Sequence, residues 1–202
     1  MMPESAHLFS DMHAALGIDL NELGCIMADV EPIEVTDYAA DAGLDPDRDL
    51  YSLRGVDSSR WWIDGAVGEK GAHVTLLYGL LQPGPVWRGH VDRLLADVDL
   101  STVTVDHVGM FDSPYPDDPY KCIVAHLKLT PELLKAHARL SYLPHVNTFP
   151  EYRAHVTLAY VKDQPSAVEW AQTTPEAWVR ALQAPLRDAP LRVTGIDYGG
   201  RS

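Results

Sequence analysis

Two short segments of the chain place a threonine two residues after a histidine. HVTLLY at residues 73–78 and HVTLAY at residues 155–160 match at five of six positions. A single His-x-Thr is weak evidence of a site, because a chain with nine histidines can carry one by chance. Two copies that also share valine, leucine and tyrosine neighbours are much harder to attribute to chance. The sequence therefore indicates a duplicated functional motif.

The spacing has a structural meaning if each segment is a β-strand. Alternate side chains of a strand point to the same face, so one face of each segment carries the imidazole and the hydroxyl. The other face is expected to hold the apolar residues and Tyr78 or Tyr160. The residues expected on the histidine faces are His73, Thr75 and Leu77 in the first segment and His155, Thr157 and Ala159 in the second.

Two such strands side by side would form a cleft with two imidazoles and two hydroxyls. One neutral histidine can take a proton from a nucleophile while a protonated histidine gives one to the leaving oxygen. The hydroxyls of Thr75 and Thr157 can stabilise the charge that develops on a phosphate. This chemistry needs no metal and no cofactor, and it predicts phosphodiester cleavage with His73 and His155 as the catalytic pair.

Two other interpretations of the histidines are weaker. Both could be core residues satisfied by their neighbours, which is the usual explanation for a lone histidine. A zinc site is disfavoured, because each segment supplies one ligand, no HExxH or HxH is present, and a third ligand would have to be guessed.

With these motifs, the sequence resembles the 2H phosphoesterases (LigT-like proteins), whose two histidine motifs have a separation similar to the 82 residues between positions 73 and 155. The resemblance covers roughly residues 24–198. It implies an α+β fold with two pseudo-symmetric lobes and mixed, mainly antiparallel sheets around a central cleft. It also implies opening of 2′,3′-cyclic phosphates or cleavage of 2′-5′ or 3′-5′ linkages in short nucleotides. A phage branch of the family degrades the cyclic oligonucleotides of bacterial antiviral defence (CBASS), and HVTLLYGL is similar to the phage form.

Five further residues are candidates for substrate binding. Arg153 should share the face of His155 by alternation, as a phosphate contact or a solvated strand end. His126 and Lys128 lie on one face of the strand predicted over 121–129. They are candidates if that face lines the cleft. Trp61 and Trp62 could stack on a base or anchor a loop. Five other histidines are not candidates: His145 lies in a proline-bounded loop, and His7, His13, His90 and His137 fall on predicted helices and are expected to be solvated.

The rest of the chain predicts the elements that carry these residues. Helical spacing or Thr-Pro starts predict helices over about 4–16, 86–98, 130–143 and 174–184. Strands are predicted over 24–30, 72–80, 102–108, 121–129, 153–161 and 191–198. Residues 31–60 are rich in acids and lack periodicity, so a loop or lid is expected there. No linker divides the 202 residues, which indicates one α+β domain.

Composition limits the partners. A formal net charge of −13 disfavours a long nucleic acid, because such partners need a basic surface. No segment predicts a signal peptide or a membrane span. The two cysteines are far apart in the sequence and are expected to be free thiols, which suits a reducing cytoplasm. If the gene is from a phage, this would be the cytoplasm of its host. The expected substrate is thus a small cyclic or short oligonucleotide. The alternatives are RNA-end processing of 2′,3′-cyclic phosphates or 2′-5′ linkages, a nucleotide-binding sponge without turnover, and a structural protein. Composition predicts no oligomeric state.

Overall fold

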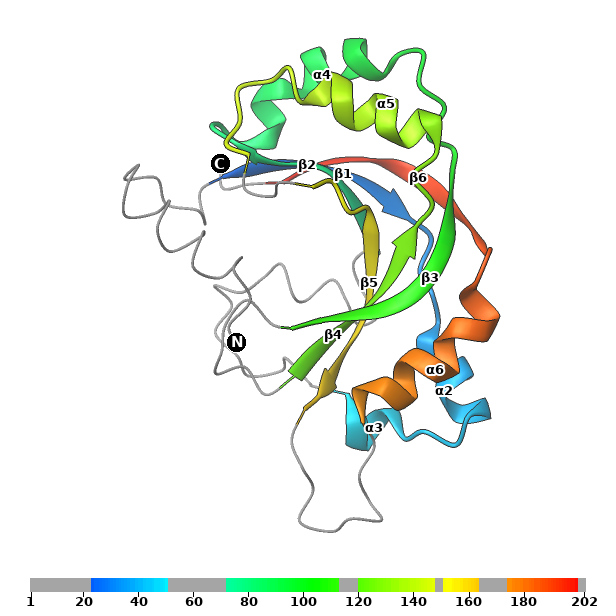
Figure 1. The fold of residues 1–202 in the computed structure, drawn as a ribbon. Coiled ribbons are helices and arrows are strands. Elements are labelled where there is room, and N and C mark those ends of the chain that lie inside the picture. The colour runs from blue at the N-terminus through cyan, green and yellow to red at the C-terminus, as the bar shows by residue number, and fades with distance from the viewer. Residues whose placement is uncertain (1–22, 51–71, 113–119, 148–150, 164–173, 200–202) are drawn as a thin grey trace.

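The computed structural model describes residues 23–50, 72–112, 120–147, 151–163 and 174–199. This part of the chain forms six strands with helices around them (Figure 1). The strands are β1 (Gly24–Val30), β2 (His73–Leu80), β3 (Thr102–Asp112), β4 (Tyr120–Leu127), β5 (His155–Lys162) and β6 (Pro190–Gly199). The helices are α2 (Val35–Asp41), α3 (Pro46–Asp49), α4 (Arg88–Leu95), α5 (Pro131–Leu140), α6 (Pro175–Leu186) and the 3₁₀ helix η3 (Gly84–Trp87). The helix predicted over 4–16 lies outside the described residues.

The strands form two three-stranded lobes. In the first lobe β1 lies between β6 and β2, and in the second lobe β4 lies between β3 and β5. Short pairings of β2 with β5 and of β3 with β6 join the lobes, so the strand order β1-β2-β5-β4-β3-β6 closes on itself. Every pairing among the described strands is antiparallel, which confirms the predicted α+β architecture.

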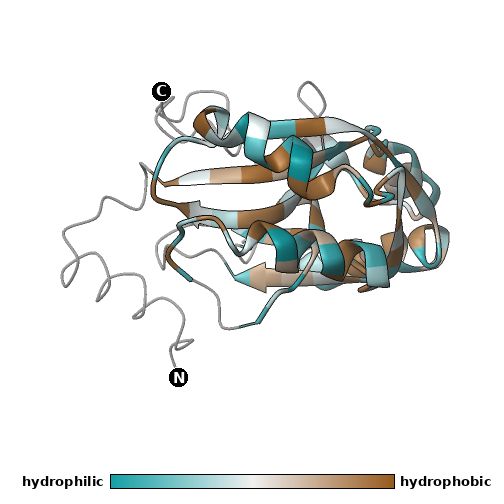
Figure 2. Cartoon of the chain, turned by 90° about the horizontal axis from the view of Figure 1, so that it is seen from above, coloured by the Kyte–Doolittle hydropathy of each residue, from teal (hydrophilic) through white to brown (hydrophobic). Residues whose placement is uncertain are grey.

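Helices cover the outer side of each lobe. Helix α5 contacts β2 and α4, whereas α6 contacts β3, β4 and β5 (Figure 1). The strands carry apolar stretches, and the helices mix hydrophilic and apolar residues, as expected for helices buried on one side (Figure 2). No described helix has the length and apolar character needed to cross a membrane. The covered sides hold the core, so the other side of each sheet is left for function.

Part of the acidic segment 31–60 is helical, so the prediction of a loop there is wrong for α2 and α3. Both helices lie beside α6 on the outside of the second lobe (Figure 1). The fully buried Trp178 of α6 donates its indole N–H to the buried Asp49 at 3.2 Å, and Arg48 also bonds Asp49. Burial alone would raise the pKa of Asp49, but these hydrogen bonds outweigh it and lower the pKa. Helices of seven and four residues are too short to show periodicity, which explains the error.

Several element boundaries also differ from the prediction. The helix predicted over 86–98 is divided into η3 and α4, and β3 continues four residues beyond the predicted end at 108. Helix α5 ends at Leu140 rather than 143, although the predicted start is confirmed, since the Thr130 hydroxyl accepts the Leu133 N–H. Strand β5 begins at His155, so Arg153 precedes the strand.

Gly79, next to the tyrosine of the first motif, has a backbone that only glycine adopts readily. Its φ is +93°, and its carbonyl accepts the N–H of Val146 at 2.8 Å. A Cβ atom at this position would collide with the carbonyl oxygen of Val146. This close approach fixes the segment after α5 to the end of β2.

We therefore expect Gly79→Ala to destabilise the fold by at least about 1–2 kcal/mol, the cost of a left-handed alanine, before the collision is added. Gly89→Ala is the matched control, because Gly89 is exposed in α4 with open space around it. There alanine should stabilise the fold by about 0.5–1 kcal/mol through the helix preference. Urea unfolding of both variants measures the difference, and equal stability of the two would contradict the role of Gly79.

Candidate active site

Each motif strand contains a leucine without a partner on the neighbouring strand. In β2, Thr75 lies opposite Met27 and Leu77 opposite Ile26, so Leu76 is an inserted residue. In β5, Leu158 is skipped in the same way between the partners of β4. Such β-bulges interrupt the alternation of side chains and redirect those that follow.

The bulges change the predicted facing of both tyrosines. Tyr78 lies opposite Cys25, which is in the same alternating set of β1 as the partners of Thr75 and His73. Directly opposite residues of an antiparallel pair share a face, so Tyr78 and Tyr160 lie on the histidine face. The expectation that they face the core is wrong. Buried Leu77 and Ala159, expected beside the histidines, belong to the core instead.

The pairing of β2 with β5 brings the two motifs together. Val74 lies directly opposite Val156, and both are fully buried. The residues on either side of each valine therefore point to the opposite, open face. Because the strands are antiparallel, His73 approaches the Thr157 side and Thr75 the His155 side. The four predicted side chains thus share one face across the junction of the lobes.

Hydrogen bonding determines the tautomer of His155. Its Nδ1–H donates to the carbonyl oxygen of Arg153 at 2.8 Å, since a carbonyl only accepts. In the neutral ring Nε2 is then the acceptor. Burial lowers the pKa of His155, and repulsion from His73 acts in the same direction, against the opposing backbone hydrogen bond. His155 therefore favours the neutral form with a free lone pair on Nε2.

His73 has a different partner at the equivalent position of the first lobe. Asp29 of β1 lies opposite His73, whereas His126 of β4 lies opposite His155. Burial and repulsion from Asp197 raise the pKa of Asp29, and the charge of His73 opposes that rise. The two motifs are thus alike in sequence and unlike in electrostatics.

A thiol and a phenol lie behind Thr157. The Cys122 thiol donates to the Thr157 hydroxyl at 3.8 Å, and Tyr160 lies opposite Cys122 within hydrogen-bonding reach of both. Burial raises the pKa of Cys122 to about 11. The thiol therefore keeps its proton at neutral pH and is not an activated nucleophile.

Two aromatic side chains fix the bulge of β2. His137 of α5 donates from Nδ1 to the carbonyl of Leu76 at 2.8 Å, and the Tyr152 hydroxyl donates to the carbonyl of Thr75 at 3.2 Å. The two rings stack at 3.9 Å with an angle of 5°. We call His137 and Tyr152 the bulge clamp. His137 is partly buried in this contact, so its predicted solvation is wrong.

Comparison with known proteins is consistent with this geometry. Residues 46–198 match the 2′-5′ RNA ligase superfamily. The chain belongs to this superfamily. It is thus a LigT-like 2H phosphoesterase, a hydrolase of phosphodiester bonds.

Two solved structures of Usb1 from Kluyveromyces marxianus, one of them with uridine monophosphate, resemble the chain. Each has 9% identity and a TM-score of 0.47, and the alignment covers 90% of this chain and 99% of that one. No curated protein matches the chain in sequence.

The remaining predicted binding residues have separate positions in this phosphoesterase. Arg153 is exposed just before β5, and its guanidinium group forms an ion pair with Glu151. Lys128 follows β4, and its ammonium group bonds Asp188. Trp61 and Trp62 lie outside the described residues. Substrate contact by any of these four stays a prediction.

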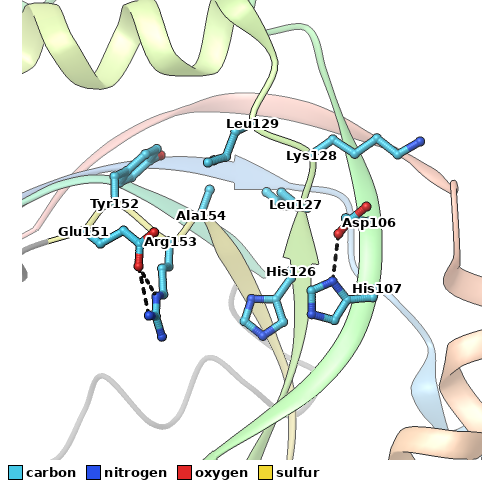
Figure 3. A pocket seen from close by; sticks show the side chains of 10 residues that line it. All are labelled: Asp106, His107, His126, Leu127, Lys128, Leu129, Glu151, Tyr152, Arg153 and Ala154. Atoms are coloured by element: carbon cyan, nitrogen blue, oxygen red, sulfur yellow. Dashed lines mark hydrogen bonds and ion pairs between the residues drawn. The ribbon is translucent and has the colours of Figure 1, made fainter.

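A pocket of about 410 Å³ lies between the end of β4 and the start of β5 (Figure 3). His126, predicted from alternation, lines it, and so does His107 of β3, which sequence analysis missed. Phe111 was also missed because the predicted strand ended at 108. Its ring meets those of His126 and His155 edge to face at 5.2 and 5.1 Å. Phe111 therefore connects His126, which lines the pocket, with His155.

A second internal repeat could have revealed part of this site. Cys-Ile-Met-Ala at 25–28 and Cys-Ile-Val-Ala at 122–125 are identical at three of four positions. They form the middle strands β1 and β4, and each cysteine lies opposite the tyrosine of a motif. Extending this repeat by one residue identifies Asp29 and His126 as the partners of the two histidines.

The bulge clamp generates a prediction for the phosphoesterase. Tyr152→Phe removes the bond to the Thr75 carbonyl, so unfolding free energy should fall by about 0.5–1.5 kcal/mol. A small shift of the first motif should lower kcat more than it raises KM, by up to about 100-fold. The matched control is Tyr142→Phe, whose ring is 87% exposed. Steady-state kinetics at a temperature where both variants are fully folded decide the matter, and unchanged kcat in Tyr152→Phe would contradict the positioning role.

Proposed function

We propose that this phosphoesterase cleaves a small cyclic or short oligonucleotide without a metal ion. His73 and His155 would be its catalytic pair, and the Thr75 and Thr157 hydroxyls would hold the phosphate. The observation that carries the proposal is the junction of β2 and β5, since the Val74–Val156 pair directs both motifs to one open face. Among the described residues, no three His, Cys, Asp or Glu side chains gather in a way that could hold a metal ion.

Within this pair we assign His155 as the base and His73 as the acid. The free Nε2 and the lowered pKa of His155 favour proton acceptance near neutral pH. Asp29 lies opposite His73 where His155 has His126, so His73 is the member of the pair with a carboxylate beside it, and we assign it as the donor to the leaving oxygen.

The proposed reaction follows from these roles. His155 removes a proton from a ribose 2′-hydroxyl or, for a cyclic phosphate, from water. The oxygen attacks phosphorus while the bond to the leaving oxygen breaks, and His73 protonates that oxygen. The threonine hydroxyls donate to the non-bridging oxygens as their charge grows.

The substrate is expected to be small because the chain has a net charge of −13. Long-range repulsion of a polyanion is screened only partly over about 8–10 Å at physiological salt. A cyclic oligonucleotide signal of the anti-CBASS kind is one candidate, and a 2′,3′-cyclic phosphate or 2′-5′ linkage at an RNA end is the alternative. A cytoplasmic location stays a prediction.

Loss of either histidine should abolish turnover without loss of the fold. We expect His73→Ala and His155→Ala to cost about 100- to 10,000-fold in kcat, the usual contribution of one proton-transfer group. Mass spectrometry of products from 2′,3′-cyclic mononucleotides, 2′-5′ dinucleotides and 3′,3′-cyclic dinucleotides, in excess EDTA, provides the assay. His145→Ala is the control, as its ring bonds the Leu143 carbonyl outside the site. Near-normal turnover in either active-site variant would refute the catalytic pair, and loss of wild-type activity in EDTA would refute metal independence.

The acid and base roles can be separated by the leaving group. In a 4-nitrophenyl phosphodiester the leaving group is 4-nitrophenolate, which departs without protonation. His73→Ala should therefore lose much less activity on this substrate than on a dinucleotide. His155→Ala should lose activity equally on both. For the wild type, kcat/KM should rise as pH rises through a pKa below 6.5, because the lowered pKa of His155 makes the neutral base available early. A reversed leaving-group pattern would exchange the two roles.

A further inference from the structure

We propose that the pocket beside His155 binds the nucleobase of a second nucleotide against the stacked rings of His107 and His126. The inference rests on the proposed function and narrows its substrate to one with nucleosides on both sides of the scissile phosphate. The pocket lies where β4 and β5 separate beyond their last pairing, His126 with His155 (Figure 3).

The pocket adjoins the reacting groups. His126 and His155 share a face because they are directly opposite, and Phe111 meets both rings edge to face. A phosphate at Nε2 of His155 would therefore have an attached nucleoside at the pocket. The volume of about 410 Å³ lies within the range of roughly 300–1,000 Å³ that is usual for small-molecule sites.

The two imidazoles stack on each other, and the outer face of this stack is suited to a base. Their centroids are 4.4 Å apart with an interplanar angle of 18°. Gly109 provides the room, since a Cβ there would lie 2.9 Å from Nε2 of His126. Burial, with repulsion from His107, His155 and Arg153, lowers the pKa of His126 to about 4. This ring is thus uncharged at neutral pH and can stack on a base, as aromatic side chains do in single-strand binding.

The charges around the pocket disfavour a second phosphate. Besides His126, three basic side chains line the cavity, and each is already bonded to a carboxylate. The bonded pairs are Lys128 with Asp188, Arg153 with Glu151, and His107 with Asp106. In Figure 3 the Lys128 ammonium also points away from the two histidine rings. A neutral base with hydrogen-bonding edges fits this surface better than an additional anion.

Binding of uncleavable ligands tests the inference without reference to turnover. The probes are the 3′-5′ dinucleoside monophosphate of 2′-deoxyadenosine, which lacks the attacking hydroxyl, and the 3′- and 5′-monophosphates of the same nucleoside. Calorimetry should show the dinucleotide binding more tightly than either mononucleotide. Replacing the half-exposed His107 with alanine should weaken dinucleotide binding by roughly 5- to 100-fold, a typical stacking contribution. It should leave binding of the more tightly bound mononucleotide unchanged, and His107→Phe should retain the dinucleotide affinity.

Lys135→Gln is the matched control, because its ammonium group bonds Asp97 outside the pocket, and it should change neither affinity. The inference is overturned if the dinucleotide gains nothing over the mononucleotides or if His107→Ala binds it normally. A loss confined to Lys128→Gln would overturn it in favour of a second phosphate. Failure of the proposed function would appear elsewhere, as normal turnover in His73→Ala or His155→Ala, and is therefore distinguishable.

Discussion

The contact between Val74 and Val156 is the constraint on which the site depends. It is the single registered pair between β2 and β5, and it unites two lobes that are otherwise complete antiparallel sheets. Because both valines are fully buried, the backbone cannot rotate either motif without exposing apolar surface. Packing of the two valines thus fixes the direction of the four polar side chains beside them.

The bulges at Leu76 and Leu158 adapt a simple strand to this task. An uninterrupted strand would bury the tyrosine that ends each motif among apolar residues, where its hydroxyl would need a partner. The inserted leucine adds a core side chain and moves the tyrosine to the histidine face, where Tyr160 is buried within reach of the Thr157 hydroxyl. The carbonyls of Thr75 and Leu76 beside the first bulge are bonded by the bulge clamp, so this irregular backbone is satisfied and held.

The sequence alone predicted the strands, most helices and the motif residues, because repeated letters and alternation are local signals. It could not predict the facing of Tyr78, since a bulge is visible only in the pairing with β1. It also missed Phe111 and His107, whose position beside His126 depends on a long-range strand pairing. Helices α2 and α3 were missed for a related reason: contacts with α6, including Trp178 with Asp49, stabilise segments that lack a pattern of their own.

The lobes repeat each other in backbone and differ where chemistry requires it. At equivalent positions of the Cys-Ile-x-Ala strands, the partner of His73 is a carboxylate and the partner of His155 is an imidazole held neutral by burial. General acid–base catalysis needs two histidines in opposite protonation states at one pH. Identical surroundings would give both the same preference, and mutual repulsion would then decide which one is charged. The exchange of Asp29 for His126 makes the two surroundings unequal, and this difference supports the proposal that His155 is the base of the pair.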